Sequence, residues 1–98
     1  MKEIDLPLKN KRVNEDFGPI ELSENVKIEG NYDIGNDKYA VEGEVTRNEK
    51  KLGRFTYNDN EKRIFVNINT EDLKRNTRIE IISAITSIVT KIVPVEAE

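Results

Sequence analysis

Cysteine and histidine are both absent from the 98 residues of the chain. Without cysteine, the protein can form no disulfide and can offer no thiol to a substrate or to zinc. Without histidine, it lacks the commonest general base and the commonest metal ligand, which excludes serine–histidine and cysteine–histidine nucleophiles. The five glycines are dispersed and build no phosphate-binding loop. We therefore expect no cofactor, no metal and no enzymatic activity; carboxylate pairs, lysine and tyrosine are the catalytic groups left.

The sequence also lacks a long apolar run and an excess of basic charge. Its 16 basic and 19 acidic residues are interleaved, giving a net charge of −3 and no basic stripe for a nucleic acid. The most apolar stretch, Ile79–Val95, is too polar to span a membrane. The charged N-terminus, Met1–Asp5, has no apolar signal-peptide core. These features predict a cytoplasmic protein that binds neither nucleic acid nor membranes.

Four segments in the middle of the chain alternate apolar and polar residues with a period of two, the pattern of half-buried strands. Short polar turns between them predict an antiparallel meander with one apolar and one charged face. Phe65 breaks the alternation and is predicted to point outward. The four segments are 26–34, 38–46, 53–57 and 62–69, and their predicted inward residues include Tyr32, Tyr39, Phe55, Tyr57, Ile64, Val66 and Ile68.

Residues 1–22 precede the predicted meander and are read as an extended N-terminal arm or edge strand. Ile4 to Leu8 alternate apolar and polar residues, but Pro7 has no backbone donor and fits only an edge strand or an arm. Lys9–Asp16 is predicted to be a charged loop. Phe17–Pro19, with its Gly-Pro pair, is predicted to be a turn.

The C-terminal segment changes to helical spacing, which predicts a helix over residues 77–93. Thr77 and Glu80 fit a capping box, and Pro94 marks the end. The apolar residues form a stripe roughly 140° wide, although their β-branched side chains favour strands. We predict one α+β domain over residues 1–98, with a four-stranded meander (24–69) and the helix packed on one face. The stripe consists of Ile81, Ile82, Ile85, Ile88, Val89, Ile92 and Val93.

Two acidic features were weighed as sites. Glu42 and Glu44 share a strand face, and paired carboxylates can do acid–base work if a pocket raises one pKa; a solubilising role is the simpler interpretation. Asp33–Glu44 resembles a calcium loop superficially, but its glycine and oxygen ligands are out of register. The polar run Asn58–Glu61 is read as a solvated turn rather than a cation site.

The residues expected to contact another protein lie outside the predicted core. An outward Phe65 beside Arg63 marks one candidate surface. The small middle of the back face of the helix, Ser83, Ser87 and Thr90, is another, because a second helix could approach it closely. An ordinary core helix with a weakly polar exterior explains the same pattern equally well.

The order of elements resembles the SecB-like export-chaperone family. The residues that carry the resemblance are Tyr39–Thr46 as second strand, Arg63–Ile68 as fourth, and the helix from Thr77 to Val93 that leads to Pro94. The chain is shorter than the full chaperones and lacks their longer crossover loop and second helix. The resemblance implies homo-oligomers formed through strands and helices, and binding of unfolded or extended polypeptide.

Two functions therefore stay open at the level of sequence. The first is a small SecB-like chaperone that binds polypeptide and assembles as a homo-oligomer. The alternative is a small phage or mobile-element effector that binds and inhibits one host protein. An enzyme that depends on Glu42 or Glu44 is a weaker third hypothesis and needs a deep pocket around them.

Overall fold

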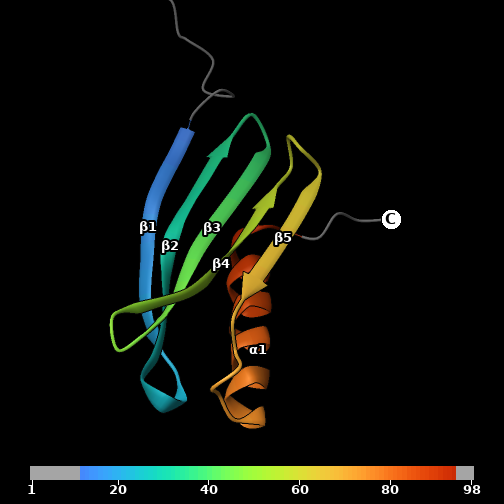
Figure 1. Cartoon of the computed structure of the whole chain (residues 1–98). Coiled ribbons are helices and arrows are strands. Elements are labelled where there is room, and N and C mark those ends of the chain that lie inside the picture. Colours follow the sequence, from blue (N-terminus) through green and yellow to red (C-terminus); the bar gives the residue numbers. More distant parts are fainter. Residues whose placement is uncertain (1–11, 95–98) are drawn as a thin grey trace, which may run out of the picture.

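The computed structural model describes residues 12–94, which form a five-stranded antiparallel sheet and one helix (Figure 1). The strands lie side by side in chain order, from β1 at one edge to β5 at the other. This arrangement confirms an α+β meander with a C-terminal helix, but it has one strand more than predicted. The elements are β1 (Arg12–Glu21), the 3-10 turn η2 (Ser23–Asn25), β2 (Val26–Gly35), β3 (Lys38–Arg47), β4 (Lys50–Asn58), β5 (Arg63–Ile68) and α1 (Arg75–Ile92).

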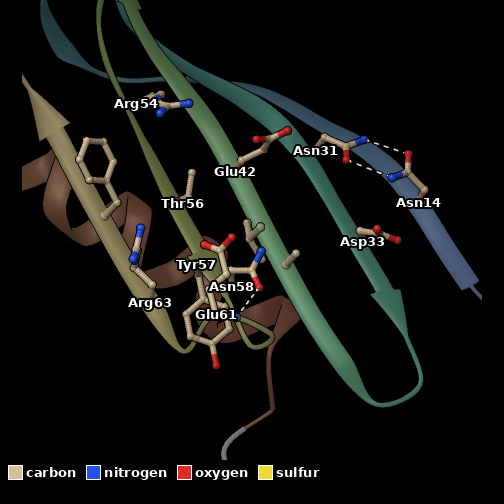
Figure 2. A pocket seen from close by; sticks show the side chains of 13 residues that line it. Asn14, Asn31, Asp33, Glu42, Arg54, Thr56, Tyr57, Asn58, Glu61 and Arg63 are labelled. Atoms are coloured by element: carbon tan, nitrogen blue, oxygen red, sulfur yellow. Dashed lines mark hydrogen bonds between the residues drawn. The ribbon is translucent and has the colours of Figure 1, made fainter.

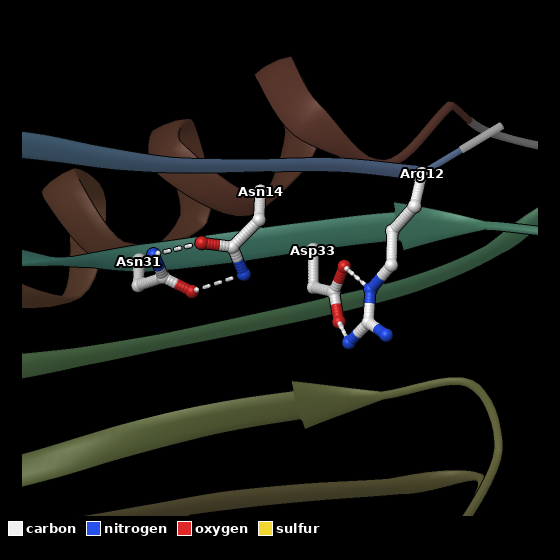
Figure 3. A network of polar contacts seen from close by, with 4 residues as sticks. All are labelled: Arg12, Asn14, Asn31 and Asp33. Atoms are coloured by element: carbon white, nitrogen blue, oxygen red, sulfur yellow. Dashed lines mark hydrogen bonds and ion pairs between the residues drawn. The ribbon is translucent and has the colours of Figure 1, made fainter.

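The additional strand is β1, where the sequence predicted a loop and a turn. The sequence pattern did not indicate this strand because its side chains are mostly polar. On the edge of the sheet, these side chains bind partners on the neighbouring strand. Asn14 pairs with Asn31 of β2 through two amide hydrogen bonds of 3.2 and 3.1 Å, and Arg12 forms a two-pronged ion pair with Asp33 (Figure 3). The Gly-Pro pair sits where the register shifts between Phe17 and Ile20, an irregularity that an edge strand tolerates. The predicted arm thus divides into β1 and residues 1–11, which lie outside the described residues.

The turns have the chemistry that the sequence indicated. Asn36 and Asp37 join β2 to β3, and Asn48 and Glu49 join β3 to β4. All four have left-handed φ values between 51° and 68°, as tight two-residue hairpins require. Leu52, which lies just outside the predicted strand segment 53–57, is the extra residue of a bulge, because Val45 pairs with Gly53 while Thr46 pairs with Lys51.

The core lies between the middle of the sheet and α1. The ring of Phe55 lies over Gly43, where an added Cβ would meet it at 2.5 Å. The ring of Phe55 thus fills the space that a side chain at position 43 would occupy, which is why this position requires glycine. Tyr32 and Tyr57, which the alternation assigned to the core, are half-buried around it. The fully buried apolar residues are Val26, Ile28, Val41, Val45, Phe55, Leu73, Ile81 and Ile88.

The helix begins differently from the prediction. It starts at Arg75 with Lys74 as N-cap and no side-chain cap, so the capping box at Thr77 and Glu80 is wrong. Both side chains instead bind the η2 turn, which lies beside the first turns of α1. Within residues 12–94, no helix is long and apolar enough to cross a membrane.

The inward side of β5 also departs from the prediction. Ile64 and Val66 project toward the helix side of the sheet, but 71% and 54% of their surface stays exposed. The main contacts of α1 are with η2 and β3, and an apolar groove remains between the helix and β5. Within residues 12–94, the apolar side of β5 is therefore only partly covered: Ile68 packs against the core, whereas Ile64 and Val66 stay largely exposed.

Candidate protein-binding surface

A groove with an almost wholly apolar lining runs between β5 and α1; we call it the β5 groove. Its volume is about 330 Å³. It is lined by the half-buried side chains of Tyr57 and Ile85 and by the exposed side chains of Ile64, Val66 and Ile82. Thr86 and Thr90 also line it, yet their hydroxyls donate to helix carbonyls, Thr86 to Ile82 O at 2.9 Å and Thr90 to Thr86 O at 2.9 Å. The groove therefore offers methyl groups rather than free polar atoms.

The outer edge of β5 borders the same groove. The backbone N–H of Asn69 donates to the carbonyl of Leu52 at 2.9 Å, one step beyond the regular pairing of Gly53 with Ile68. In an antiparallel ladder, successive residues turn their backbone groups to alternate sides. Phe65 and Asn67 thus turn theirs toward β4, while the even-numbered residues of β5 turn theirs outward. Ile64, Val66 and Ile68 consequently combine outward backbone groups with side chains on the helix side.

The two edge strands of the sheet differ in the features that prevent pairing with another chain. Natural sheets blunt an edge with charge, proline or a bulge. The β1 edge has Arg12, Asp16 and Pro19, and its register shifts between Phe17 and Ile20. The β5 edge has a regular register from Arg63 to Ile68 and no charged residue after Arg63. Of the two edges, β5 is the one open to another strand.

The five residues predicted to contact a partner do not form one surface. Thr90 lines the β5 groove, whereas Ser83 and Ser87 are exposed on α1 outside it. Phe65 and Arg63 lie on the other face of the sheet. The site residues missing from that prediction are Ile64 and Val66, which the alternation had placed on the inward face of the sheet, and Ile82, which belonged to the apolar helix stripe. The available signal was an apolar helix stripe wider than a narrow sheet contact needs.

The opposite face of the sheet is polar and hollowed, as Figure 2 shows. There the guanidinium of Arg54 lies over the ring of Phe65, 5.5 Å from its centroid, a cation–π contact that covers part of the aromatic face. Phe65 retains 39% exposure. It is thus a partly shielded aromatic in a charged surface rather than an open apolar patch.

The carboxylates of this face have no enclosed pocket. Glu42 and Glu44 are exposed: both border a broad hollow of about 520 Å³, and Glu42 also borders one of about 570 Å³. Glu44 forms an ion pair with Lys51 at 3.3 Å across the β3–β4 hairpin. No three of the described Asp and Glu residues stand close enough together to hold a metal ion. This arrangement fits the solubilising interpretation of the two glutamates.

Two carboxylates join the first turns of α1 to η2. Glu24 accepts hydrogen bonds from Thr77 Oγ1 and from Lys74 N at 3.0 Å, which lower its pKa below the usual 4.5. Glu80 accepts from Ser23 Oγ at 2.7 Å and from Ser23 N at 3.0 Å, and its pKa is lowered for the same reason.

Comparisons with known proteins contribute no relative. No family model, no curated protein and no solved structure matches the chain. The function is therefore argued from the β5 edge and its groove.

Proposed function

We propose that the chain is a non-catalytic, cytoplasmic protein-binding domain that holds an extended, partly apolar polypeptide segment along β5, in the manner of a small SecB-like chaperone. The observation that supports the proposal is the coincidence of an unpaired strand edge with an apolar groove directly beneath it. Main-chain hydrogen bonds to the edge supply sequence-independent affinity, and alternate side chains enter the groove.

The exposed side chains set the scale of the affinity. Ile64 is 71% exposed and Ile82 is 66% exposed, so covering each contributes roughly 1–2 kcal/mol. With Val66 and a few edge hydrogen bonds, and after the cost of ordering the peptide, a dissociation constant of about 10–100 µM is expected. Such binding is reversible, which suits a protein that holds and then releases its client.

A matched pair of lysine variants on β5 tests the proposal. Val66→Lys places a charge on the groove side, and Asn67→Lys places the same charge on the polar side of the same strand; both positions are exposed, so both variants should fold. The probe is a fluorescein-labelled eight-residue peptide in which valine and threonine alternate. We expect Val66→Lys to weaken its binding at least tenfold, measured by fluorescence anisotropy, and Asn67→Lys to change it less than twofold.

A second assay addresses the chaperone reading. The wild-type protein should suppress the aggregation of a heat-unfolded model enzyme, and Val66→Lys should suppress it less. Equal peptide binding by both lysine variants, or none by the wild type, removes the proposed site. If neither peptide nor client binds and affinity capture from a lysate returns one stoichiometric folded partner, the host-protein inhibitor becomes the better interpretation.

A further inference from the structure

We infer that the N-terminal segment Ile4–Leu8 of a second copy is the resident occupant of the β5 groove, added to β5 as an antiparallel sixth strand. The inference rests on the groove and edge of the proposed function and names a partner for them. The segment lies outside the described residues, and it ends four residues before Arg12 in the sequence.

The first argument is the match of side chains. Ile4, Leu6 and Leu8 alternate with Asp5 and Pro7, so an extended segment presents three large apolar residues on one side. The helix side of β5 has three as well: Ile64 and Val66, which line the groove, and Ile68, which is half-buried against the core. Pairing Leu6 with Val66 aligns all three across the two strands.

The second argument is the position of the proline. With Ile4, Leu6 and Leu8 facing the groove in an antiparallel pair, these same residues exchange hydrogen bonds with the outward groups of β5. Pro7, which has no N–H, then turns its nitrogen away from β5, where none is needed. A parallel pair would instead require the backbone donors of Asp5 and Pro7. Pro7 therefore selects the antiparallel direction, the same as between all other strands of this sheet.

The polar side of the added strand fits the same register. Asp5 would lie opposite the uncharged Asn67, and Pro7 would lie against the ring of Phe65. The next residue of the segment, Lys9, would face Arg63, and two like charges directly opposite are unfavourable. The pairing accordingly ends at Leu8.

The third argument is reach, and it assigns the segment to a second copy. β1 and β5 are opposite edges of the sheet, so a sixth strand beside β5 lies five strand spacings, or about 24 Å, from β1. The chain from Leu8 to Arg12 extends over at most about 14 Å. A molecule cannot lay this segment along its own β5, whereas reciprocal exchange between two copies closes a dimer.

The absence of cysteine permits a direct test in the full-length protein. Leu6→Cys and Val66→Cys are made in separate chains and mixed under mild oxidation, so that a mixed disulfide can form only between molecules. Directly bonded antiparallel partners have Cα atoms about 5.5 Å apart, a separation that suits a disulfide. Lys27→Cys, at an exposed position on the polar face of β2, replaces Val66→Cys in the control mixture.

We expect the mixed disulfide of Leu6→Cys with Val66→Cys to form roughly a hundredfold faster than the control, because the docked strand has a millimolar effective concentration. We also expect a dimer by light scattering at 100 µM, and a monomer for Leu6→Asp with an unchanged circular dichroism spectrum. A mixed disulfide no faster than the control overturns the inference. So does a dominant disulfide between two Val66→Cys chains, which would show β5 pairing with β5.

The same variants separate this inference from the proposed function. Because the arm and a client compete for β5, Leu6→Asp should bind the alternating valine–threonine peptide several-fold more tightly than wild type does. If the peptide binds but the mixed disulfide does not form, the docking of Ile4–Leu8 on β5 is wrong and the proposed peptide-binding function stands. If the mixed disulfide forms but the peptide binds neither to the wild type nor to Leu6→Asp, the docking of Ile4–Leu8 stands and the proposed peptide-binding function is wrong.

Discussion

Replacing Ile81 or Ile82 by alanine should separate the stability of the fold from the binding of a partner. The two residues are neighbours in α1, but Ile81 is 2% exposed in the core and Ile82 is 66% exposed beside the β5 groove. Alanine removes the same three carbon atoms at each position. Any difference in stability or in peptide affinity between the two variants therefore reflects the position of each side chain, because the chemical change is the same.

The two exposed fractions predict different losses of unfolding free energy for the two variants. At Ile81 the lost transfer free energy is about 2.4 kcal/mol, and the cavity left against the sheet raises the cost to roughly 3–4 kcal/mol of unfolding free energy. At Ile82 only a third of the side chain is buried, which is about 0.8 kcal/mol, and the higher helix propensity of alanine offsets part of it. The exposed two thirds of Ile82 represent about 1.6 kcal/mol for a partner that covers them, or roughly a tenfold loss of affinity.

Urea unfolding followed by circular dichroism measures the first quantity, and anisotropy with the alternating valine–threonine peptide measures the second. Ile82→Ala should unfold within about 0.5 kcal/mol of wild type and bind the peptide roughly tenfold more weakly. A loss of 2 kcal/mol or more for Ile82→Ala would refute the reasoning, because α1 would then have to present a different face to the sheet. Unchanged peptide affinity with unchanged stability would place the partner elsewhere.

Two further predictions concern the sheet and the attachment of α1. Gly30→Ala should cost about 2–3 kcal/mol in urea unfolding because its Cβ would lie 2.0 Å from the carbonyl oxygen of Glu42, whereas Gly35→Ala, whose nearest neighbour is 3.7 Å away, should be neutral. Because Glu24 and Glu80 both have a lowered pKa in the folded state, their contribution to stability is complete above about pH 4.5 and is lost as the pH falls through their folded values. Thermal melts from pH 6 to pH 3 should show this loss in the wild type and a smaller one in Glu24→Gln; an identical pH dependence in both would contradict the role of Glu24.

The sequence predicted the centre of the molecule better than its edges. The strands from Val26 to Arg47 follow the period of two closely, because one of their faces is buried and the other is wet. β1 was missed because an edge strand needs no continuous apolar face. Its backbone pairing with β2 is accompanied by the side-chain contacts of Arg12 with Asp33 and of Asn14 with Asn31, which no local sequence pattern displays.

The candidate site was missed for a related reason. Alternation correctly placed Ile64 and Val66 on the helix side of the sheet, but a pattern does not reveal how far the helix extends beneath that side. The capping-box prediction failed similarly, because Thr77 and Glu80 had better partners in η2, more than 50 residues away in the sequence. Tertiary contacts decided both outcomes.

These two errors have a common origin that explains why the protein has an open edge. Glu24 and Glu80 fasten the first turns of α1 to η2, at the junction between β1 and β2. A helix held there packs on β3, and the β5 groove is the space left between the helix and the fifth strand. The exposure of Ile64 and Val66 is therefore a consequence of where the helix is anchored, and these side chains form the surface that we propose receives a strand from another molecule.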